Sequence, residues 1–276
     1  MSSARFGRVF LTMFCLVWLM ACAHSDETIS AEGSQKVLVT DQIGFDFADG
    51  VNLPADTEEN QRVFTMPNFR VGTGANRILI VGIQFELQGS KAIVDKVVVS
   101  GVTFGGQALT LIPGSEIQFS WKHIGIEITY KVLVYYLINP PSGSQDITVT
   151  YAGLVPSGNV GAISLYNAKQ TAPLVLTTNT QNKKKKVIIT KVTTKNDGAW
   201  VVDMVGCNHK SDLKPQTEDH VLRFSAQEFA GGKSSLVGGT LPVPTAGEVT
   251  LHWAMTNRYN RLAHVAVEIS PEPVTQ

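Results

Sequence analysis

The sequence predicts an all-β protein, an antiparallel β-sandwich of jelly-roll type built from two similar halves. Three observations support this. Short runs rich in β-branched and aromatic residues recur at intervals of roughly 8 to 15 residues, Gly, Pro and Asn punctuate them, and hardly any segment has the i, i+3, i+4, i+7 spacing of an amphipathic helix. The 276-residue chain is 43% hydrophobic, which is ample material for the core of such a sandwich.

Two stretches of the sequence share one layout, which suggests that the halves are two versions of one unit. Residues 146–168 (DITVTYAGLVPSGNVGAISLYNA) and 248–270 (EVTLHWAMTNRYNRLAHVAVEIS) each contain an alternating run, a polar turn and a second alternating run. The two runs begin 16 residues apart in both copies, and a Pro/Gly turn precedes each copy. We therefore expect equivalent strand pairs, with each half supplying strands to both sheets of one sandwich.

Strand signals follow one another along residues 37–272, which we expect to form a single β-sandwich domain. The clearest are residues 77–85 (RILIVGIQF), 97–112 (VVVSGVTFGGQALTLI), 127–138 (EITYKVLVYYLI) and 199–207 (AWVVDMVGC). Gly105 and Gly106 in the second segment permit the positive φ angles of a tight hairpin. Pro140 and Pro141 end the third segment, because proline cannot donate to the strand ladder.

The N-terminus has the pattern of a bacterial lipoprotein signal. Arg5 and Arg8 form a positively charged region, and residues 9–20 form an apolar run that is too short to span a bilayer comfortably. The sequence Leu-Met-Ala-Cys that ends at Cys22 resembles a lipobox, so we expect Cys22 to be lipidated and to become the first residue of the mature protein. The alternative is ordinary cleavage after the A-x-A-like sequence Ala-Cys-Ala at residues 21–23.

The predicted boundaries follow from this signal. Residues 1–21 are expected to be a signal peptide, residues 22–36 a disordered tether and residues 273–276 a C-terminal tail. The tether contains mostly small and charged residues, so it cannot bury enough apolar surface to become ordered. Cys207 is the one cysteine of the mature body, which excludes an intramolecular disulfide there. We expect Cys207 to be a buried structural thiol.

Charge argues against nucleic acid as a partner. Without Arg5 and Arg8, which belong to the signal, 21 basic residues face 23 acidic residues, a net charge of about −2. The one basic run is Lys183 to Lys186. We interpret it as a solvated stretch of a polar loop, and contact with anionic lipid or polysaccharide is the alternative.

Six segments resemble a family of secreted bacterial modules that occur singly or in tandem in exported proteins. They are NRILIVGIQFE, VTFGGQALTLI, YYLINPPSGSQDITVTYAG, GAISLYNA, DGAWVVDMVG and RLAHVAVEISP. The resemblance covers about residues 37–272. It implies an exported β-sandwich. The family is defined by strand and turn residues, not by a catalytic signature, so the resemblance implies no role for any single residue.

Histidines and carboxylates near the C-terminus are candidates for a metal site. If residues 248–255 pair with residues 262–269, then His252, His264 and Glu268 share one face, and Asp203 joins them if its strand is adjacent. Two histidines and a carboxylate can bind a metal. We favour the alternative of scattered polar residues on an exposed sheet face, so the sequence predicts no metal and no cofactor. It contains none of the G-x-S-x-G, H-E-x-x-H, Walker, EF-hand or Rossmann motifs.

Aromatic residues give the better indication of a binding site. Six aromatic or imidazole side chains lie within 18 residues: Phe119, Trp121, His123, Tyr130, Tyr135 and Tyr136. Part of this region coincides with 19 residues that the second half lacks, and insertions in sandwiches usually form loops that bind ligands. Sugars pack on flat aromatic rings. We expect Tyr130 and Tyr136 to face the core, and Trp121 and Tyr135 to form an exposed ligand-binding pair.

These observations favour a lipid-anchored, non-catalytic β-sandwich of the bacterial envelope, at the outer membrane or cell surface, that binds a glycan or another envelope or extracellular component. One alternative is a structural subunit of an envelope or extracellular assembly, in which exposed sheet edges pair with partners. The other is an enzyme acting on polysaccharide. A groove lined with aromatics supports binding, a long unprotected edge strand supports assembly, and two carboxylates about 5 to 10 Å apart in a cleft support catalysis.

Overall fold

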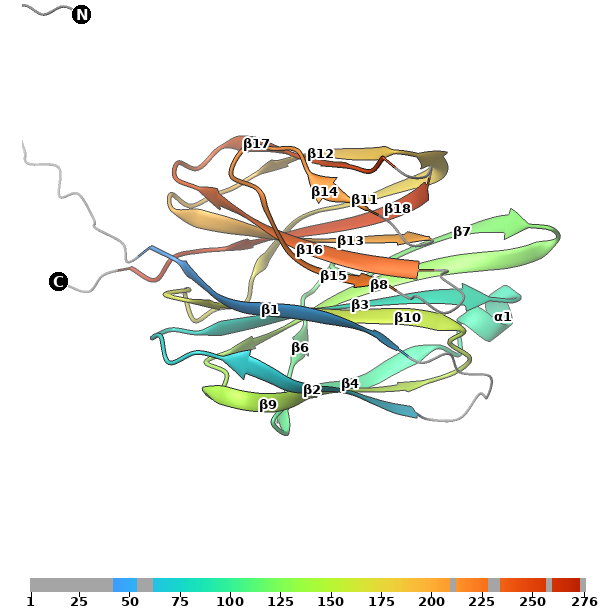
Figure 1. The fold of residues 1–276 in the computed structure, drawn as a ribbon, viewed down its shortest axis with the longest axis horizontal. Helices are drawn as coiled ribbons and strands as arrows, with labels where there is room; N and C mark the ends of the chain where they lie inside the picture. Colours follow the sequence, from blue (N-terminus) through green and yellow to red (C-terminus); the bar gives the residue numbers. More distant parts are fainter. Residues whose placement is uncertain (1–41, 54–61, 209–211, 228–233, 257–259, 274–276) are drawn as a thin grey trace, which may run out of the picture. The chain divides into compact units, whose positions relative to one another are not determined.

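The computed structural model describes residues 42–53, 62–208, 212–227, 234–256 and 260–273, and these are almost entirely β-strand (Figure 1). The elements, in chain order, are β1 (Gly44–Leu53), β2 (Arg62–Val71), β3 (Ile78–Gln88), α1 (Lys91–Val94), β4 (Val98–Phe104), β5 (Gln107–Ala108), β6 (Thr110–Leu111), β7 (Ile117–His123), β8 (Ile126–Ile138), β9 (Gly143–Ala152), β10 (Ser157–Tyr166), β11 (Leu174–Lys185), β12 (Val187–Thr193), β13 (Ala199–Asn208), β14 (Lys214–Pro215), β15 (Val221–Gln227), β16 (Ser234–Val243), β17 (Glu248–Ala254) and β18 (Asn260–Ile269). Cys22, the predicted signal peptide and the predicted tether lie outside the described residues.

The described strands form four antiparallel sheets, two in each half of the chain. In the first half the orders are β1-β10-β3-β8-β6, with β7 on β8, and β2-β9-β4-β5. In the second half the orders are β11-β18-β13-β16-β15 and β12-β17-β14. If β1, β2, β3, β4, β5, β8, β9 and β10 are counted as strands one to eight, the first half has the orders 1-8-3-6 and 2-7-4-5, which is a jelly roll.

The two halves have equivalent topology. β11, β18, β13 and β16 follow the order of β1, β10, β3 and β8, and β12, β17 and β14 follow β2, β9 and β4. The two repeated stretches therefore correspond, with β9 and β10 in the first half matching β17 and β18 in the second. This confirms the predicted all-β jelly-roll sandwich with two similar halves and the equivalence of the two strand pairs.

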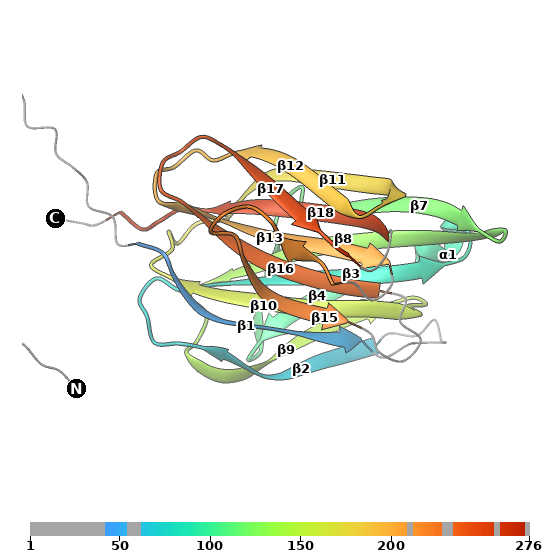
Figure 2. The ribbon, with the colours of Figure 1, turned by 45° about the horizontal axis from the view of Figure 1, so that its top comes forward.

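The arrangement of the halves differs from the expectation of one shared sandwich. Strand pairing joins strands within a half, so each half forms its own two-sheet jelly roll. The larger sheets of the two jelly rolls pack against each other. Figure 1 therefore shows four layers in order: the sheet of β2 and β9, the sheet of β3, the sheet of β13, and the sheet of β12 and β17. β1 lies beside β15, and β10 beside β16, in both Figure 1 and Figure 2.

Apolar side chains from both halves fill the space between the larger sheets. On the first half these include Ile80, Val134 and Ile163, and on the second Met204 and Val265, all nearly inaccessible. The other faces of the same strands belong to the separate cores inside each jelly roll. The strands of the larger sheets are therefore covered on both faces, and their alternate residues belong to two different cores.

Glycine allows the two larger sheets to approach closely at one point. A Cβ atom added to Gly161 of β10 would lie 2.0 Å from the ring of Phe224 on β15, and one added to Gly238 of β16 would lie 2.2 Å from the same ring. Phe224 thus occupies the volume that side chains at these two positions would need. The Phe224 ring therefore packs at the contact between the larger sheets of the two halves.

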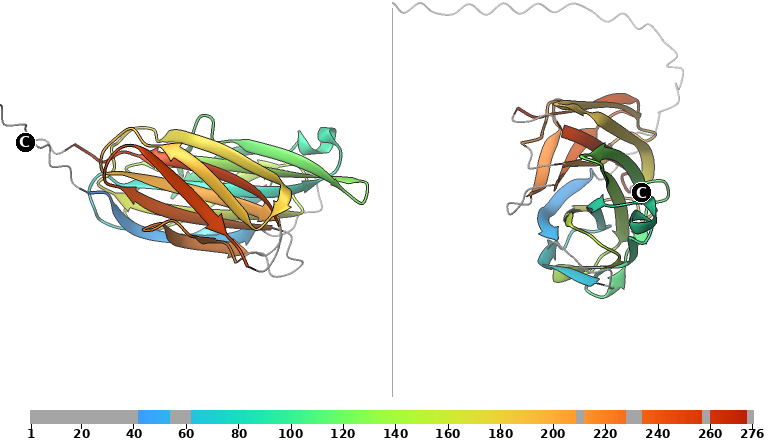
Figure 3. Two further views of the ribbon diagram at one scale, coloured as in Figure 1. Left: turned by 90° about the horizontal axis from the view of Figure 1, so that it is seen from above. Right: turned by 90° about the vertical axis from the view of Figure 1, so that its right-hand side faces the viewer.

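The 19-residue surplus of the first half contributes a strand hairpin where a loop was expected. β7 pairs along its whole length with β8, from Ile117 opposite Val132 to His123 opposite Ile126. Ile124 and Gly125 form the turn with φ angles of 48° and 78°. Figure 3 shows this green hairpin extending past the ends of the neighbouring strands. The hairpin carries Trp121 and His123, and it forms one side of the pocket described below.

Two expectations for single residues have clear outcomes. Cys207 is fully buried, and its Sγ atom lies 3.1 Å from Ser235 Oγ, which confirms a buried structural thiol. Lys183 to Lys185 end strand β11, whereas the basic run was expected to lie in a loop.

No helix among the described residues is long and apolar enough to cross a membrane.

Candidate functional site

A pocket of about 340 Å³ lies between the two jelly rolls, beside the β7–β8 hairpin. The first half lines it with Glu86, Gln88, Trp121, His123, Ile126 and Ile128, and the second half with Lys184, Asn208 and Arg261. Six strands contribute, namely β3, β7, β8, β11, β13 and β18. Neither half alone provides this lining.

Trp121 lines the pocket as the outer member of a stack of aromatic rings. Trp121 is half-buried, and its ring lies 5.2 Å from that of Tyr130 and 5.8 Å from that of Phe119, with small interplanar angles. Strand pairing explains the stack, because Phe119 lies directly opposite Tyr130 and Trp121 is two residues further on the same face. Tyr130 is completely buried, so the stack rests on the core between the halves.

Cationic side chains from the second half complete the pocket. The guanidinium of Arg261 lies 4.5 Å from the ring centroid of Trp121, a cation–π contact that joins the halves. The backbone N–H of Arg261 donates to Asn208 Oδ1 at 2.7 Å, which fixes the start of β18 against β13. Lys184 is exposed at the end of β11, where the next residue, Lys185, lies opposite Asn260.

A buried carboxylate is among the residues that line the pocket. Glu86 is 4% exposed and accepts a hydrogen bond from the phenol of Tyr130. The side-chain amide of Gln88 also donates to Glu86, at 3.4 Å. These donors offset the cost of burying the carboxylate, and the hydrogen bond holds Tyr130, on which Trp121 is stacked, in place.

The structure separates the two aromatic residues that were expected to form an exposed pair. Trp121 lines the pocket, but Tyr135 is 7% exposed and packs inside the first jelly roll. Ile128 lies opposite Trp121, and Tyr135 is an odd number of residues further along β8, which places it on the other face. Burial and the nearby Glu116 carboxylate raise the pKa of Tyr135 to about 12. The exposure expected for Tyr135 is therefore wrong, because both faces of β8 are covered.

Arg261 and Lys184 were missed as site residues. Arg261 precedes the second apolar run of the repeat, and nothing in its local sequence indicates a partner on β7. Lys184 belongs to the basic run that was interpreted as solvated. Both reach the pocket because the larger sheets pack together, which brings residues from β7 near residues about 60 and 140 positions later in the chain.

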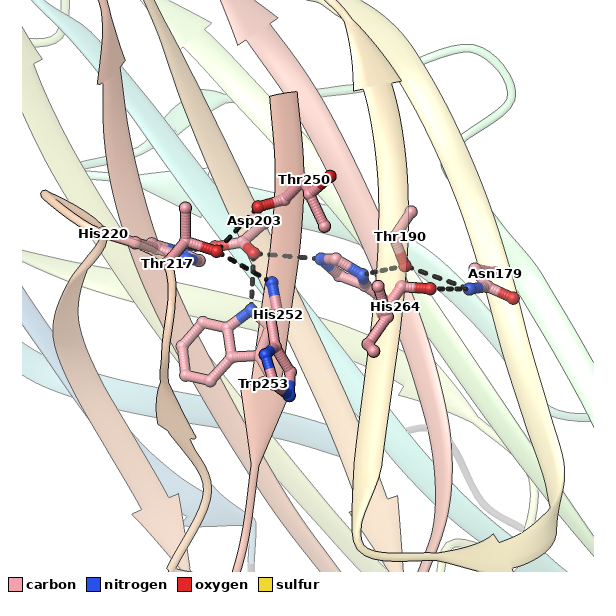
Figure 4. A network of polar contacts seen from close by, with 10 residues as sticks. Asn179, Thr190, Asp203, Thr217, His220, Thr250, His252, Trp253 and His264 are labelled. Carbon is pink, nitrogen blue, oxygen red and sulfur yellow. Dashed lines mark hydrogen bonds and ion pairs between the residues drawn. The ribbon is translucent and has the colours of Figure 1, made fainter. Parts of the chain in front are cut away.

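A second polar cluster lies inside the second jelly roll, centred on Asp203 of β13 (Figure 4). The Asp203 carboxylate is bonded at 3.0 Å to Nε2 of His220 and at 3.0 Å to Nε2 of His264, and it accepts a hydrogen bond from Trp253 Nε1 at 2.7 Å. The side chains of Asp203 and both histidines have no solvent exposure. Burial alone would raise the pKa of Asp203, but the two histidines outweigh it and hold the pKa below its ordinary value.

The cluster continues to the surface side of the same jelly roll. His264 Nδ1 lies 2.9 Å from Thr190 Oγ1, and Asn179 Nδ2 donates to the same hydroxyl at 3.0 Å. A hydroxyl, an imidazole and a carboxylate thus stand in series, the order found in nucleophilic triads. Since Thr190 is 5% exposed and Asp203 and His264 are sealed, this arrangement offers no access to a substrate. We therefore assign it to stability.

The expected face shared by His252, His264 and Glu268 is wrong. β17 and β18 do not pair, because β17 lies in the smaller sheet and β18 in the larger. His264 and Glu268 are buried between these sheets, whereas His252 is half-buried on the outward face of β17. Glu268 accepts hydrogen bonds from the backbone N–H of Lys195 at 2.9 Å and from Asn196 Nδ2 at 2.7 Å. Among the described residues, no group of three or more His, Cys, Asp or Glu could hold a metal ion.

The first half provides a comparison for the Asp203 cluster. Through the strand registers, Leu79, Ala162 and Tyr151 correspond to Asp203, His264 and Trp253, and Phe64 corresponds to Thr190. The same jelly roll is thus built in the first half with mainly apolar residues at these positions. The fold itself does not require the buried polar cluster.

Searches with family models, of curated proteins and of solved structures found no match to this chain.

Proposed function

We propose that this chain is a lipid-anchored, non-catalytic binding protein of the bacterial envelope, which holds a glycan in the pocket between its two jelly rolls. One observation carries the proposal: half-buried Trp121 lines a pocket of about 340 Å³ together with polar side chains from both halves. Small-ligand sites combine aromatic walls with a few convergent polar groups, and they are often found between domains. Sugars, which present both C–H faces and hydroxyls, match such a lining.

The volume of the pocket favours a small ligand. It lies at the lower end of the range for small-molecule sites, about 300–1,000 Å³. A short saccharide segment suits this volume, whereas a folded envelope protein needs a surface of roughly 800 Å² on each partner.

The alternatives have less support. Among the described residues that line the pocket, Glu86 is the one carboxylate, and glycosidases typically use a pair. The edge strand β12 exposes Ile189, which would favour pairing with a partner strand. However, Asn179 Nδ2 donates to the carbonyl of Ile189 at 3.4 Å, and the charged Lys191 follows on the same strand. Both features oppose the addition of a further strand there.

Binding is tested with the full-length chain in detergent on a saccharide array. We expect binding to a defined set of saccharides, and loss of this binding in Trp121→Ala. Trp200→Ala is the matched control, because Trp200 is also half-buried between the halves but lies at the opposite end of β13 from Asn208, about 26 Å away at the usual rise of a strand. If no saccharide binds, or if the two variants lose binding equally, the proposal fails.

The lipid anchor is tested by labelling cells with an alkyne fatty acid. We expect label on the wild-type chain and none on Cys22→Ala. Cys15→Ala is the matched control, since Cys15 lies within the predicted signal peptide and should not carry lipid. A labelled Cys22→Ala variant would contradict the assignment of the lipid site.

A further inference from the structure

The pocket between the jelly rolls has an excess of positive charge. Arg261 and Lys184 line it from the second half of the chain. The opposing charge is Glu86, whose carboxylate is buried and accepts hydrogen bonds from Tyr130. The whole chain has 23 basic and 23 acidic residues, so this local excess reflects placement and not overall composition.

The surroundings of the pocket extend the positive charge. Lys183 and Lys185 flank Lys184 on β11, and all three are exposed. Lys185 lies opposite Asn260, which directly precedes Arg261, so the basic run ends beside the arginine of the pocket. Lys122 of the hairpin lies opposite Glu127, whose charge opposes its own.

Arg261 is held in a way that suits the recognition of an anion. Its guanidinium lies against the indole of Trp121 at 4.5 Å, and its backbone is tied to Asn208 at 2.7 Å. A guanidinium held over a ring presents its donors in a fixed planar fork, and this fork matches the two oxygens of a carboxylate. Preorganisation of this kind lowers the entropy lost when a ligand binds.

We infer that the ligand is an acidic saccharide, in which a sugar carboxylate engages Arg261, with Lys184 as a second charge contact and Trp121 as the apolar wall. The inference rests on the proposed function, because it names the class of glycan that the same pocket binds. It makes Arg261 the residue that determines specificity.

The test compares hexagalacturonate with its fully methyl-esterified form, which has the same sugars without the charges. Titration calorimetry on the full-length chain in detergent is expected to give binding of the acid that is at least tenfold tighter than binding of the ester. Arg261→Gln is expected to weaken binding of the acid by roughly 10- to 100-fold, the range for loss of a hydrogen bond to a charged group. Binding of the ester should change little in this variant.

Two matched controls isolate the role of the pocket. Arg70 is an exposed arginine that also lies over an aromatic ring, 5.0 Å from the centroid of Phe47, but it does not line the pocket. Arg70→Gln should therefore leave binding unchanged. Lys184→Gln should weaken binding of the acid more than Lys183→Gln, because Lys184 lines the pocket and Lys183 does not. Equal effects of the two lysine variants would indicate diffuse charge attraction and would overturn the inference.

The saccharide array and a lipid assay separate the remaining outcomes. Binding confined to carboxylated saccharides, and weakened by Arg261→Gln, supports the inference. Equal binding of neutral saccharides overturns it but preserves the proposed function. Binding to phosphatidylglycerol vesicles or to inorganic phosphate without binding to hexagalacturonate or any acidic saccharide of the array also overturns it. An absence of binding to any saccharide overturns both.

Discussion

Replacement of Asp203 by leucine tests whether the buried polar cluster stabilises the second jelly roll. Leu79 occupies the corresponding position of the first half, so leucine is compatible with this site in the fold. In the variant, however, His220, His264 and Trp253 lose their shared acceptor in a region without solvent exposure. We expect Asp203→Leu to lower the free energy of unfolding by about 3–5 kcal/mol.

The magnitude follows from the three hydrogen bonds of the cluster. Each buried polar group left without a partner costs about 1–3 kcal/mol, and three such groups would give a higher sum. The histidines can change tautomer, and His264 keeps its contact with Thr190 Oγ1 at 2.9 Å, so the loss should be smaller than this sum. The leucine side chain also adds apolar contacts that aspartate lacks, and this gain offsets a further part of the lost stability.

Urea unfolding of the single variants and of the double variant provides the measurement. His264→Ala introduces the residue found at the corresponding position 162 of the first half. Because Asp203 and His264 are partners, we expect the double variant to be less destabilised than the sum of the single variants by about 0.5–3 kcal/mol. Strict additivity, or a loss below about 0.5 kcal/mol in Asp203→Leu, would refute the assigned role.

Three further predictions address pH, packing and burial. The pKa of Asp203 in the folded protein is lowered from its ordinary value of 3.8. Its contribution to the free energy of unfolding is therefore complete above pH 3.8 and is lost as the pH falls below this value. The stability of the wild type should thus fall more steeply with acid than that of Asp203→Leu. Gly161→Ala places a methyl group 2.0 Å from Phe224 and should cost about 1–3 kcal/mol, whereas Gly101→Ala, with nothing within 4 Å, should cost less than about 0.5 kcal/mol in urea unfolding. Tyr135→Phe should leave phenolate absorbance unchanged near pH 10, since Tyr135 ionises near pH 12.

Periodicity was sufficient to predict the fold class, because each strand of a jelly roll covers a core with alternate residues. The equal spacing of the two repeated stretches also predicted that β9 and β10 correspond to β17 and β18, which the topology confirms. Within 77–85, Leu79 and Val81 are alternate residues of the segment, and both lie in the core of the first jelly roll. Such local patterns depend on neighbours along the strand and can be inferred without tertiary structure.

Packing between the halves could not be predicted from the same patterns. Gln84 and Glu86 follow the apolar start of β3 on its second face, where polar residues ordinarily indicate solvent. In the structure both side chains are buried. Gln84 Nε2 donates to the carbonyl of Cys207 in the second half at 3.4 Å, and Glu86 lines the pocket between the halves. A polar residue has the same periodicity whether a partner sheet or water satisfies it, so sequence alone cannot distinguish the two.

The same limitation applies to the candidate site. Trp121 was predicted as a binding residue because it lies in a surplus of the first half that is rich in aromatic residues, and it lines the pocket. Tyr135 was assigned to the surface on the assumption that one face of β8 meets solvent, which fails because both faces are covered. Arg261 acquires its place from a contact with Trp121 that spans 140 positions of the chain, and no local pattern carries such information.

The correspondence between the halves identifies which features the jelly roll does not need. Strand β8 corresponds to β16, but β7 has no counterpart at the same register among the described strands of the second half, and β7 is the element that brings Trp121 to Arg261. The Asp203 cluster of the second half is the other feature, since mainly apolar residues occupy the corresponding positions of the first half. This cluster is buried away from solvent. Only the first of these two departures from symmetry creates an accessible volume. Because that volume is lined from both halves, a ligand bound there would contact both jelly rolls and stabilise their packing, by about 2.7 kcal/mol at a hundredfold excess over Kd.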